Sequence, residues 1–234
     1  MEYIKTQEPL NRKDQIFEIL KQKGKVTVAE LASTLFVSEM TIRRDLADME
    51  KDGFLKRYRG GAVLPVDQLP ISHRMFLEED EKRSLAQQTE QYLHDHMTVY
   101  IDSSSTCNYI IPHLKKFNGI QIITNSIKAL QTASDFHFSC TLLGGDYMEK
   151  DMCLVGPIAN MQAQNINVDI AFFTSQGLSD DGIISDTDLE QTTVRYFIMQ
   201  NAKQNVFLFE KTKLHQIYLH TLAKAENVTA IITA

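Results

Sequence analysis

The chain has 234 residues, of which 43% are hydrophobic and 23% charged, and its formal net charge at pH 7 is −6. This length allows one large domain or two modest ones, and the composition excludes collagen-like, low-complexity and intrinsically disordered chains. No apolar run approaches the roughly 18–20 residues that span a bilayer, and the sequence shows no signal-peptide pattern. We therefore expect a soluble, cytoplasmic protein.

The charge is divided unevenly along the chain. Residues 1–64 carry 12 Lys and Arg against 10 Asp and Glu, whereas the remaining 170 residues carry 12 against 20. Pro65 and Pro70 lie where the balance changes, as is typical of a connecting segment. We predict a first domain over 1–64, a linker over 65–75 and a second domain over 76–234. Six basic residues of the first domain cluster within seventeen positions: Arg43, Arg44, Lys51, Lys56, Arg57 and Arg59.

Three short helices are predicted in the first domain, because apolar residues recur there at helical spacing and capping residues precede them. The first starts at Asn11 or Asp14 and ends at Gly24, the second follows Thr27, and the third runs from Ser38 to about Lys51. Only a very short turn separates the second helix from the third. This arrangement predicts a helix-turn-helix.

The third predicted helix has two contrasting faces. At about 100° per residue, Ile42, Leu46 and Met49 share one face, which we expect to be buried. The opposite face carries Met40, Arg44, Ala47 and Lys51. An arginine so placed can donate two hydrogen bonds to guanine O6 and N7 in the major groove, and neighbouring Thr, Arg and Lys can hold phosphates. The alternative is an ordinary solvated helix face.

The segment that follows favours the DNA-reading interpretation. In FLKRYRGGAV, a short β-prone run with basic residues meets a pair of glycines, which predicts a small hairpin, or wing. A wing beside a recognition helix lies along the adjacent sugar-phosphate backbone, where positive charge contributes more than sequence.

The stretch VTVAELASTLFVSEMTIRRDLADMEKDGFLKRYRGGAV resembles the winged helix-turn-helix of the DeoR family of bacterial transcriptional regulators. The patterns that carry the resemblance are V-S-x-x-T-I-R-R-D-L in the recognition helix and R-x-G-G-A in the wing. Because the family reads operator DNA with this helix, the resemblance implies operator DNA as a partner. Together with Lys51 on the exposed face, the expected DNA-binding residues are Ser38, Thr41, Arg43, Arg44, Lys51, Arg57 and Arg59.

Helices alternate with short β-rich runs from residue 79 onward. Such alternation indicates an α/β domain with a mainly parallel sheet covered on both faces, in which ligands bind beyond the carboxyl ends of the strands. Strands are predicted over 98–102, 120–124, 138–143, 168–173, 206–210 and 229–233, and helices over 81–95, 109–117, 127–133 and 189–201.

Polar residues follow four of the predicted strands. They lie at 102–106, 124–126, 144–146 and 210–213. The run from Asp102 through three serines to Thr106 enters a helix, and hydroxyls with free backbone N–H groups at such a place suit a phosphate or another anion. The alternative is that Ser105 or Thr106 only caps the helix. Four polar strand ends in one domain favour a pocket.

The second domain resembles the DeoR-family sensor domain, which is similar in fold to ribose-5-phosphate isomerase and binds phosphorylated sugars. The family patterns D-S-G-T-T, T-N-S, the glycine pair and D-x-[ST]-K appear at 102–106, 124–126, 144–145 and 210–213. The resemblance implies that 102–106 hold the phosphate while Asn125, Asp169 and Lys213 approach the sugar. The expected effector-binding residues are Asp102, Ser103, Ser104, Ser105, Thr106, Asn125, Gly144, Gly145, Asp169 and Lys213.

Some positions depart from the family pattern. Ser104 replaces a glycine, which limits how closely the backbone can approach a phosphate. Thr174 stands where the family has glycine, Glu210 replaces aspartate, and Arg195 stands near a usual lysine. A DNA-binding regulator with an altered or inactive effector pocket is therefore one alternative.

The sequence as a whole predicts a transcriptional repressor of sugar-metabolism genes that binds operator DNA as a homodimer or homotetramer and responds to a phosphorylated sugar. A sugar-phosphate isomerase with an accessory DNA-binding domain is the enzymatic alternative, but its catalytic set is incomplete or substituted here. We expect no catalytic residues, no cofactor and no membrane association. No metal site is expected either, because His94 and His96 have no third ligand nearby.

Overall fold

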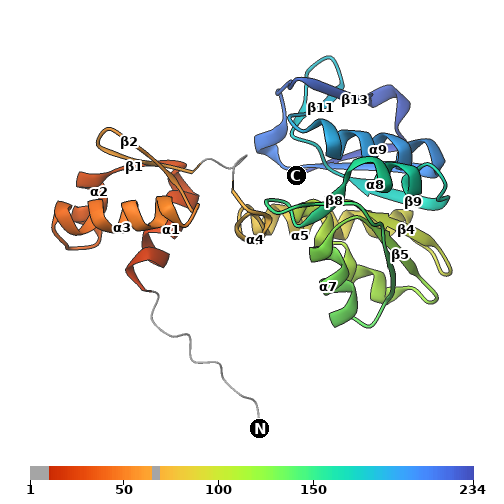
Figure 1. The fold of residues 1–234 in the computed structure, drawn as a ribbon, viewed down its shortest axis with the longest axis horizontal. Helices are drawn as coiled ribbons and strands as arrows, with labels where there is room; N and C mark the ends of the chain where they lie inside the picture. The colour runs from red at the N-terminus through yellow and green to blue at the C-terminus, as the bar shows by residue number, and fades with distance from the viewer. Residues whose placement is uncertain (1–10, 65–68) are drawn as a thin grey trace, which may run out of the picture. The chain divides into compact units, whose positions relative to one another are not determined.

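The computed structural model describes residues 11–64 and 69–234, and the chain divides into two compact units with the boundary between Leu77 and Glu78. Each unit has its own hydrophobic core. Figure 1 shows the elements of both units along the chain. Within the described residues, no helix is both long and apolar enough to cross a membrane.

The first unit is a winged helix-turn-helix. Its three short strands form an antiparallel sheet in the order β1-β3-β2, and β2 and β3 make the wing. The elements are α1 (Arg12–Lys23), β1 (Lys25–Thr27), α2 (Val28–Thr34), α3 (Glu39–Lys51), β2 (Lys56–Tyr58), β3 (Gly61–Val63) and α4 (Ile71–Arg74).

Side-chain caps set the starts of the three main helices, as predicted. Asn11 accepts a hydrogen bond from the backbone N–H of Asp14, so α1 begins after Asn11. Thr27 caps α2 and Ser38 caps α3 in the same way. Each cap satisfies a backbone N–H that the helix itself leaves without a partner. The predicted inner face of α3 is buried in the core of the unit.

Part of the segment predicted as a linker, 65–75, lies outside the described residues, at 65–68. Beyond it, Leu69 and Ile71 are fully buried in the core of the first unit. His73 stacks on Phe54, with 4.1 Å between the ring centroids. Residues from Leu69 to Leu77 therefore pack as part of the first unit.

Phe36, in the turn between α2 and α3, has a φ of 55° and a side chain that is 94% exposed. Left-handed backbone is unfavourable for a bulky residue, and an exposed ring recovers little by packing. Asparagine tolerates this conformation better. We expect Phe36→Asn to raise the free energy of unfolding by about 0.5–1 kcal/mol. Urea unfolding measures the change, and a loss of stability would show that the ring packs in a way the exposure does not indicate.

The second unit is built on a six-stranded sheet with the strand order β14-β12-β9-β4-β5-β6, in which every pair of neighbours is parallel. This confirms the predicted parallel sheet. The chain builds outward from β4 through β5 to β6 and then returns to β9 on the other side of β4. The strands are β4 (Thr98–Ile101), β5 (Gln121–Thr124), β6 (Ser139–Leu142), β9 (Val168–Phe173), β12 (Ala202–Phe209) and β14 (Ala230–Thr233).

Helices cover both faces of this sheet, because alternate strand residues are apolar on both sides. Val99 and Ile101 belong to the core that includes α7, whereas Tyr100 belongs to the core that includes α8 and α9. The helices are α5 (Glu79–Gln88), α6 (Ser105–Asn108), α7 (Ile127–Asp135), α8 (Gly156–Ala163) and α9 (Leu189–Asn201).

Two sequence-based expectations need correction here. The range 109–117, predicted as a helix, contains a 3₁₀ segment over Ile111–Lys116, and the α-helical turn that precedes it, α6, ends at Asn108. Pro112 has no N–H to donate to the carbonyl of Asn108, so α6 cannot continue through it. The sequence also gave no prediction of α8 or of the strands in two small antiparallel sheets: β7 (Asp146–Met148), β8 (Cys153–Val155), β10 (Gly177–Leu178), β11 (Ile183–Asp186) and β13 (His220–Lys224).

Candidate DNA-reading face and sensor site

The outer face of α3 carries exposed basic side chains. Arg44 and Lys51 are exposed and form no hydrogen bond or ion pair within the described parts of the chain. Arg43 is paired with Glu39 one turn earlier, at 2.6 Å. Thr41 contacts the capping Ser38, with 2.9 Å between the hydroxyl oxygens. Of the two arginines on α3, Arg44 is thus the one whose donors have no acceptor in residues 11–64 and 69–234.

An ion pair between the exposed Arg12 and the buried Asp45 fixes α3 against α1. Asp45 is 6% exposed and accepts two hydrogen bonds from the guanidinium of Arg12, one of them 3.0 Å long. Lys13 and Asp48 form a second, exposed link at 3.3 Å. The side chain next to Arg44 therefore points inward and orients the helix. This role of Asp45 was not predicted, because its partner Arg12 lies 33 positions earlier in the chain.

The wing is attached to the end of α3 through Arg57. Its backbone N–H donates to Glu50 at 2.8 Å and its Nε donates to the other carboxylate oxygen at 2.7 Å. These hydrogen bonds lower the pKa of Glu50, so the carboxylate remains ionised. Arg57 therefore has an intramolecular partner, whereas Arg59, at the turn of the wing, has none within the described residues.

A cleft of about 440 Å³ separates α3 from the wing. It is lined by Val28, Arg43, Leu46, Glu50, Arg57, Tyr58, Arg59, Gly60 and Gly61. Gly61 is required here, because a Cβ at this position would lie 2.1 Å from the carbonyl oxygen of Val26. The close contact between the strands positions the wing beside the exposed end of α3. All seven predicted DNA-binding residues therefore belong to α3, its cap or the wing.

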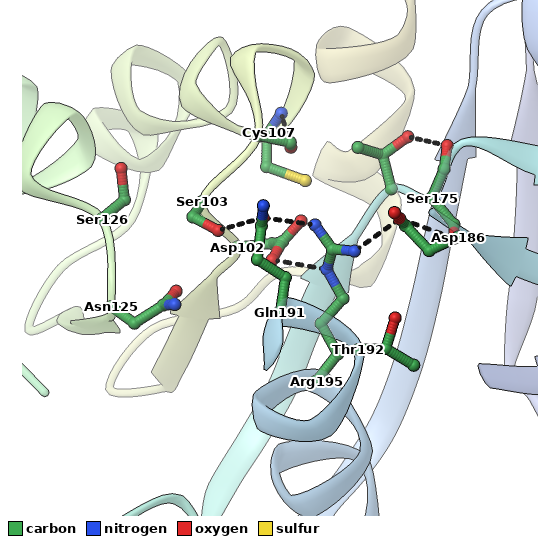
Figure 2. A network of polar contacts seen from close by, with 12 residues as sticks. Asp102, Ser103, Cys107, Asn125, Ser126, Ser175, Asp186, Gln191, Thr192 and Arg195 are labelled. Carbon is green, nitrogen blue, oxygen red and sulfur yellow. Dashed lines mark hydrogen bonds and ion pairs between the residues drawn. The ribbon is translucent and has the colours of Figure 1, made fainter. Parts of the chain in front are cut away.

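In the second unit, a network of buried polar side chains lies at the carboxyl ends of β4 and β9, where the strand order reverses (Figure 2). Ligands of open α/β sheets bind at this kind of switch point. Asp102 directly follows β4, and Thr174 and Ser175 directly follow β9. All three residues are at most 4% exposed.

Arg195, on α9, is the centre of this network. Its Nε donates to Asp102 at 3.0 Å and its Nη1 donates to Asp186 at 2.7 Å. Its Nη2 donates to Gln191 at 3.2 Å, so all three nitrogens have acceptors. Figure 2 shows the guanidinium between the two carboxylates. Burial opposes ionisation, but the two carboxylates outweigh it and raise the pKa of Arg195.

Gln191 connects the arginine to the loop after β4. Its Oε1 accepts from the Ser103 hydroxyl at 3.2 Å, and its Nε2 donates to Asp151 at 2.7 Å. On the other side of Arg195, the Ser175 hydroxyl contacts Asp186 at 3.1 Å. Gln191, Ser175, Asp186 and Asp151 were not among the predicted site residues, because α9 and β11 reach the switch point only through the tertiary fold.

The remaining predicted residues of the loop after β4 are buried as well. Ser104, not Ser105 or Thr106, caps α6, by accepting from the N–H of Cys107 at 3.1 Å. The Thr106 hydroxyl donates to Glu210, which follows β12. Lys213 lies 3.0 Å from the second oxygen of Glu210 and 3.1 Å from the hydroxyl of Thr174. The structure therefore brings Lys213 to the same edge of the sheet as Asp102.

Glu210 is ionised although it is buried. Burial alone would raise its pKa, but Lys213 and Lys82, with the Thr106 hydrogen bond, lower the pKa to about 2 from 4.5. Its stabilisation is therefore present above pH 4.5 and is lost as the pH falls from 4.5 to about 2.

We expect Glu210→Gln to lower the free energy of unfolding at pH 7 by about 1–3 kcal/mol, because two lysines lose their carboxylate. The difference from wild type should shrink below pH 4.5. Thermal unfolding at pH 7, 5 and 3 measures both effects. A difference that stays constant down to pH 3 would contradict the lowered pKa of Glu210.

Asn125, Gly144 and Gly145 contact the strands and helices that surround this edge of the sheet. Asn125 accepts from the Tyr100 hydroxyl at 2.9 Å and donates to the carbonyl of Leu154 at 3.0 Å. The N–H of Gly144 donates to Gln162 at 2.7 Å. Gly145 has a φ of 151°, and a Cβ there would lie 2.4 Å from the carbonyl oxygen of Val155. These residues hold β5, β6 and α8 in place around the switch point.

Asp169 requires a correction. It is the second residue of β9 and accepts from the backbone N–H of Thr98, the first residue of β4, at 2.8 Å. Its other oxygen is paired with Lys203 at 2.7 Å. Asp169 therefore lies at the amino ends of the strands, opposite the switch-point site. Asp169 is near the start of the strand VDIAFF, whereas ligands bind beyond the end of such strands.

Two buried polar atoms of this edge have no hydrogen-bond partner among the described residues: Asp102 Oδ2 and Asn108 Oδ1. A buried oxygen without a donor is costly unless a ligand or water supplies one. The described residues contain no group of three or more His, Cys, Asp and Glu side chains that could hold a metal ion. Asp102 Oδ2 is therefore a candidate acceptor for a ligand hydroxyl.

A winged helix-turn-helix together with an α/β unit that has a polar site at its switch point defines the class of two-domain transcriptional regulators. Two family models match the chain: the DeoR-like helix-turn-helix domain over residues 12–68 and the DeoR C terminal sensor domain over 77–234. The chain belongs to the DeoR family.

Its similarity to curated proteins spans nearly the whole chain. The HTH-type transcriptional regulator GolR of Listeria innocua is 28% identical over 96% of this chain and 90% of its own length. The glycerol-3-phosphate regulon repressor of Escherichia coli is 24% identical over 95% of this chain and 89% of its own length. Among solved structures, a D-ribose-5-phosphate isomerase in complex with phospho-erythronic acid matches 58% of this chain and 54% of its own, with 16% identity and a TM-score of 0.45.

Proposed function

We propose that this protein is a repressor that binds operator DNA through α3 and the wing and releases it when a phosphorylated sugar binds at the switch-point site. The observation that carries the proposal is that two separate sites each have an unpaired polar group among the residues that the structure describes. Arg44 on the outer face of α3 has no acceptor there, and the buried Asp102 Oδ2 has no donor. The relatives support a role in sugar-related regulation, because one is named a glycerol-3-phosphate regulon repressor and another a lactose phosphotransferase system repressor.

The DNA-binding part of the proposal follows from the charges on the first unit. Arg44 is positioned to pair with a guanine, while Arg59, Lys51 and Arg43 lie where phosphates of the same groove pass. Arg57 is tied to Glu50, so we assign it chiefly to holding the wing in place. Two half-sites in the major groove about one helical turn apart require a symmetric oligomer, so we propose a homodimer or homotetramer.

The sensor part of the proposal follows from the polar groups at the switch point. A sugar hydroxyl can donate to Asp102 Oδ2, and the ammonium of Lys213, which is 20% exposed, can approach a phosphate. Effector binding would release DNA only if the effector binds the DNA-free arrangement better. We place this regulator in the cytoplasm, where its DNA and its effector meet.

The function is tested by selecting duplexes from a random DNA library with the full-length protein and measuring affinity for the selected and the random sequences. We expect the selected duplexes to share a repeated motif and to bind at least 10³-fold more tightly than random DNA. Equal affinity for both would overturn the proposal.

The enzymatic alternative is tested in parallel. Asp169 is at the wrong end of the sheet, and Asp102 is occupied by Arg195, so an acid-base pair of these two residues is not assembled. We propose that the chain is not an isomerase. Turnover of ribose 5-phosphate by the pure protein, lost in Asp102→Asn, would contradict this.

A further inference from the structure

Two of the exposed large apolar side chains of the first unit flank the cap of the recognition helix. Phe36 precedes Ser38 by two residues, and Met40 follows it by two. The side chain of Met40 is 75% exposed although it lies in the first turn of α3. An apolar side chain left in water at such a position contributes little to folding. Such a side chain contributes binding energy when a partner covers it.

The surroundings of Met40 indicate what that partner is. A cleft of about 590 Å³ is lined by Arg12, Met40, Thr41, Arg43, Arg44, Asp45 and Asp48. Met40 lies one turn before Arg44 on the same face, and Arg44 has no protein acceptor within the described residues. A second protein with an apolar surface would have to bury this free guanidinium as well. A DNA major groove satisfies the arginine and also offers apolar groups.

The apolar group that a major groove presents is the C5-methyl of thymine. In helix-turn-helix proteins, residues near the amino end of the recognition helix contact the base edges. We propose that Met40 is a specificity-determining residue that packs on a thymine methyl next to the base pair read by Arg44. This inference rests on the proposed function, because it requires α3 to enter the major groove.

The geometry also separates Met40 from Phe36. Phe36 lies outside the helix, in the turn, with its backbone in the left-handed region. Met40 lies on the same face of α3 as Arg44, Ala47 and Lys51. This face is opposite the buried Ile42 and Leu46. Phe36 therefore serves as a matched control: it is an even more exposed apolar side chain near the same cap, but it is not on the reading face.

The experiment replaces thymine by deoxyuridine, which removes the methyl and leaves every hydrogen-bonding group unchanged. The full-length protein binds its library-selected duplex in a fluorescence anisotropy titration, and each thymine of one half-site is replaced in turn. We expect one replacement to weaken the wild type about fourfold, the fold-change for burying one methyl-sized group. In Met40→Ala the same replacement should weaken DNA binding less than twofold. Met40→Leu and Phe36→Asn should still show the fourfold weakening.

The outcomes separate the inference from the function on which it rests. If the protein selects no specific duplex, the proposed function fails and the inference fails with it. If it selects a duplex but no deoxyuridine weakens binding, or if Met40→Ala keeps the wild-type methyl effect, the inference is overturned while the DNA-binding function stands. Loss of the same methyl effect in Phe36→Asn would assign the contact to Phe36 instead and also overturn it. Circular dichroism verifies that each variant is folded.

Discussion

We expect Arg195→Ala to lower the free energy of unfolding of the second unit by about 3–5 kcal/mol, because removing one partner of a buried ion pair leaves the other charge uncompensated. Here two carboxylates, Asp102 and Asp186, lose their cation at once, and both are at most 4% exposed. Gln191 loses a donor as well. Thermal and urea unfolding of the full chain measure the loss in the transition of the second unit.

The pH dependence of this variant gives an independent check. Burial favours the neutral form of Asp186, but Arg195 and hydrogen bonds from neighbouring groups outweigh it and lower its pKa from 3.8. The stabilisation of this carboxylate is therefore present above pH 3.8 and is lost as the pH falls through its lowered pKa. Removing Arg195 removes the largest influence that lowers the pKa of Asp186, so protonation of this carboxylate becomes easier in the variant. We expect the defect of Arg195→Ala to be smaller at pH 4 than at pH 7.

Arg83 is the matched control, because it is an arginine of the same unit whose ion pair with Glu79 is exposed. Exposed pairs of this kind contribute about 0–1 kcal/mol, so Arg83→Ala should change stability little. Arg195→Lys keeps a charge but loses two donors, and we expect an intermediate loss. Equal stability of Arg195→Ala and Arg83→Ala at pH 7 would contradict a structural role for the network in Figure 2.

The second large effect is expected on DNA. Arg44→Ala should weaken binding to the selected duplex by about 1–3 kcal/mol and relax the preference at one base pair, because a bidentate contact to guanine is lost. Binding to random DNA should change less, since phosphate contacts account for most of it. Anisotropy titrations against the selected duplex, its single-base variants and random DNA measure both quantities at a fixed salt concentration.

Arg59→Ala is the control for this prediction. Arg59 lies at the turn of the wing beside Gly60, so we assign it to phosphates. Its loss should weaken selected and random duplexes alike and reduce the salt dependence of binding. If Arg44→Ala and Arg59→Ala had the same effect on both kinds of DNA, the assignment of α3 as the base-reading helix would be wrong.

Much of the DNA-binding unit could be predicted from the sequence, because its signals are local. Asn11, Thr27 and Ser38 each cap a helix whose apolar spacing is visible in a few turns. The ion pair of Arg12 with Asp45 spans 33 positions, and that of Glu50 with Arg57 depends on the fold of the wing. The side chains that fix the orientation of α3 were therefore not predicted.

The sensor site was predicted only in part, for a similar reason. Asp102, Thr106 and Lys213 follow strands, and the carboxyl ends of parallel strands lie at one edge of a sheet. The rest of the site comes from α9, which carries Arg195 and Gln191, and from β11, which ends at Asp186. The sequence does not show that these two elements reach the same edge of the sheet. Asp169 shows the opposite error, since a residue near the start of a strand was assigned to the site at its end.

The departures from the family pattern acquire a physical meaning in the structure. Ser104 caps α6: its hydroxyl oxygen accepts a hydrogen bond from the backbone N–H of Cys107. A glycine at this position would have no side chain to make this hydrogen bond. Thr174 hydrogen-bonds to the carbonyl of Leu208 and contacts Lys213. Glu210 links Thr106 to Lys213 at the carboxyl edge of the sheet. Each substituted side chain thus has partners, and the edge remains an organised site.

A single titration tests whether effector binding at the switch-point site changes DNA binding by α3 and the wing. The full-length protein is titrated into its selected duplex with and without each member of a panel of phosphorylated sugars, and the unphosphorylated sugars serve as controls. We predict that at least one phosphorylated sugar weakens DNA binding by 5-fold or more, within the usual range of about 5–150-fold for coupled sites, while its unphosphorylated counterpart does not. DNA affinity that is unchanged by every compound in the panel would contradict it.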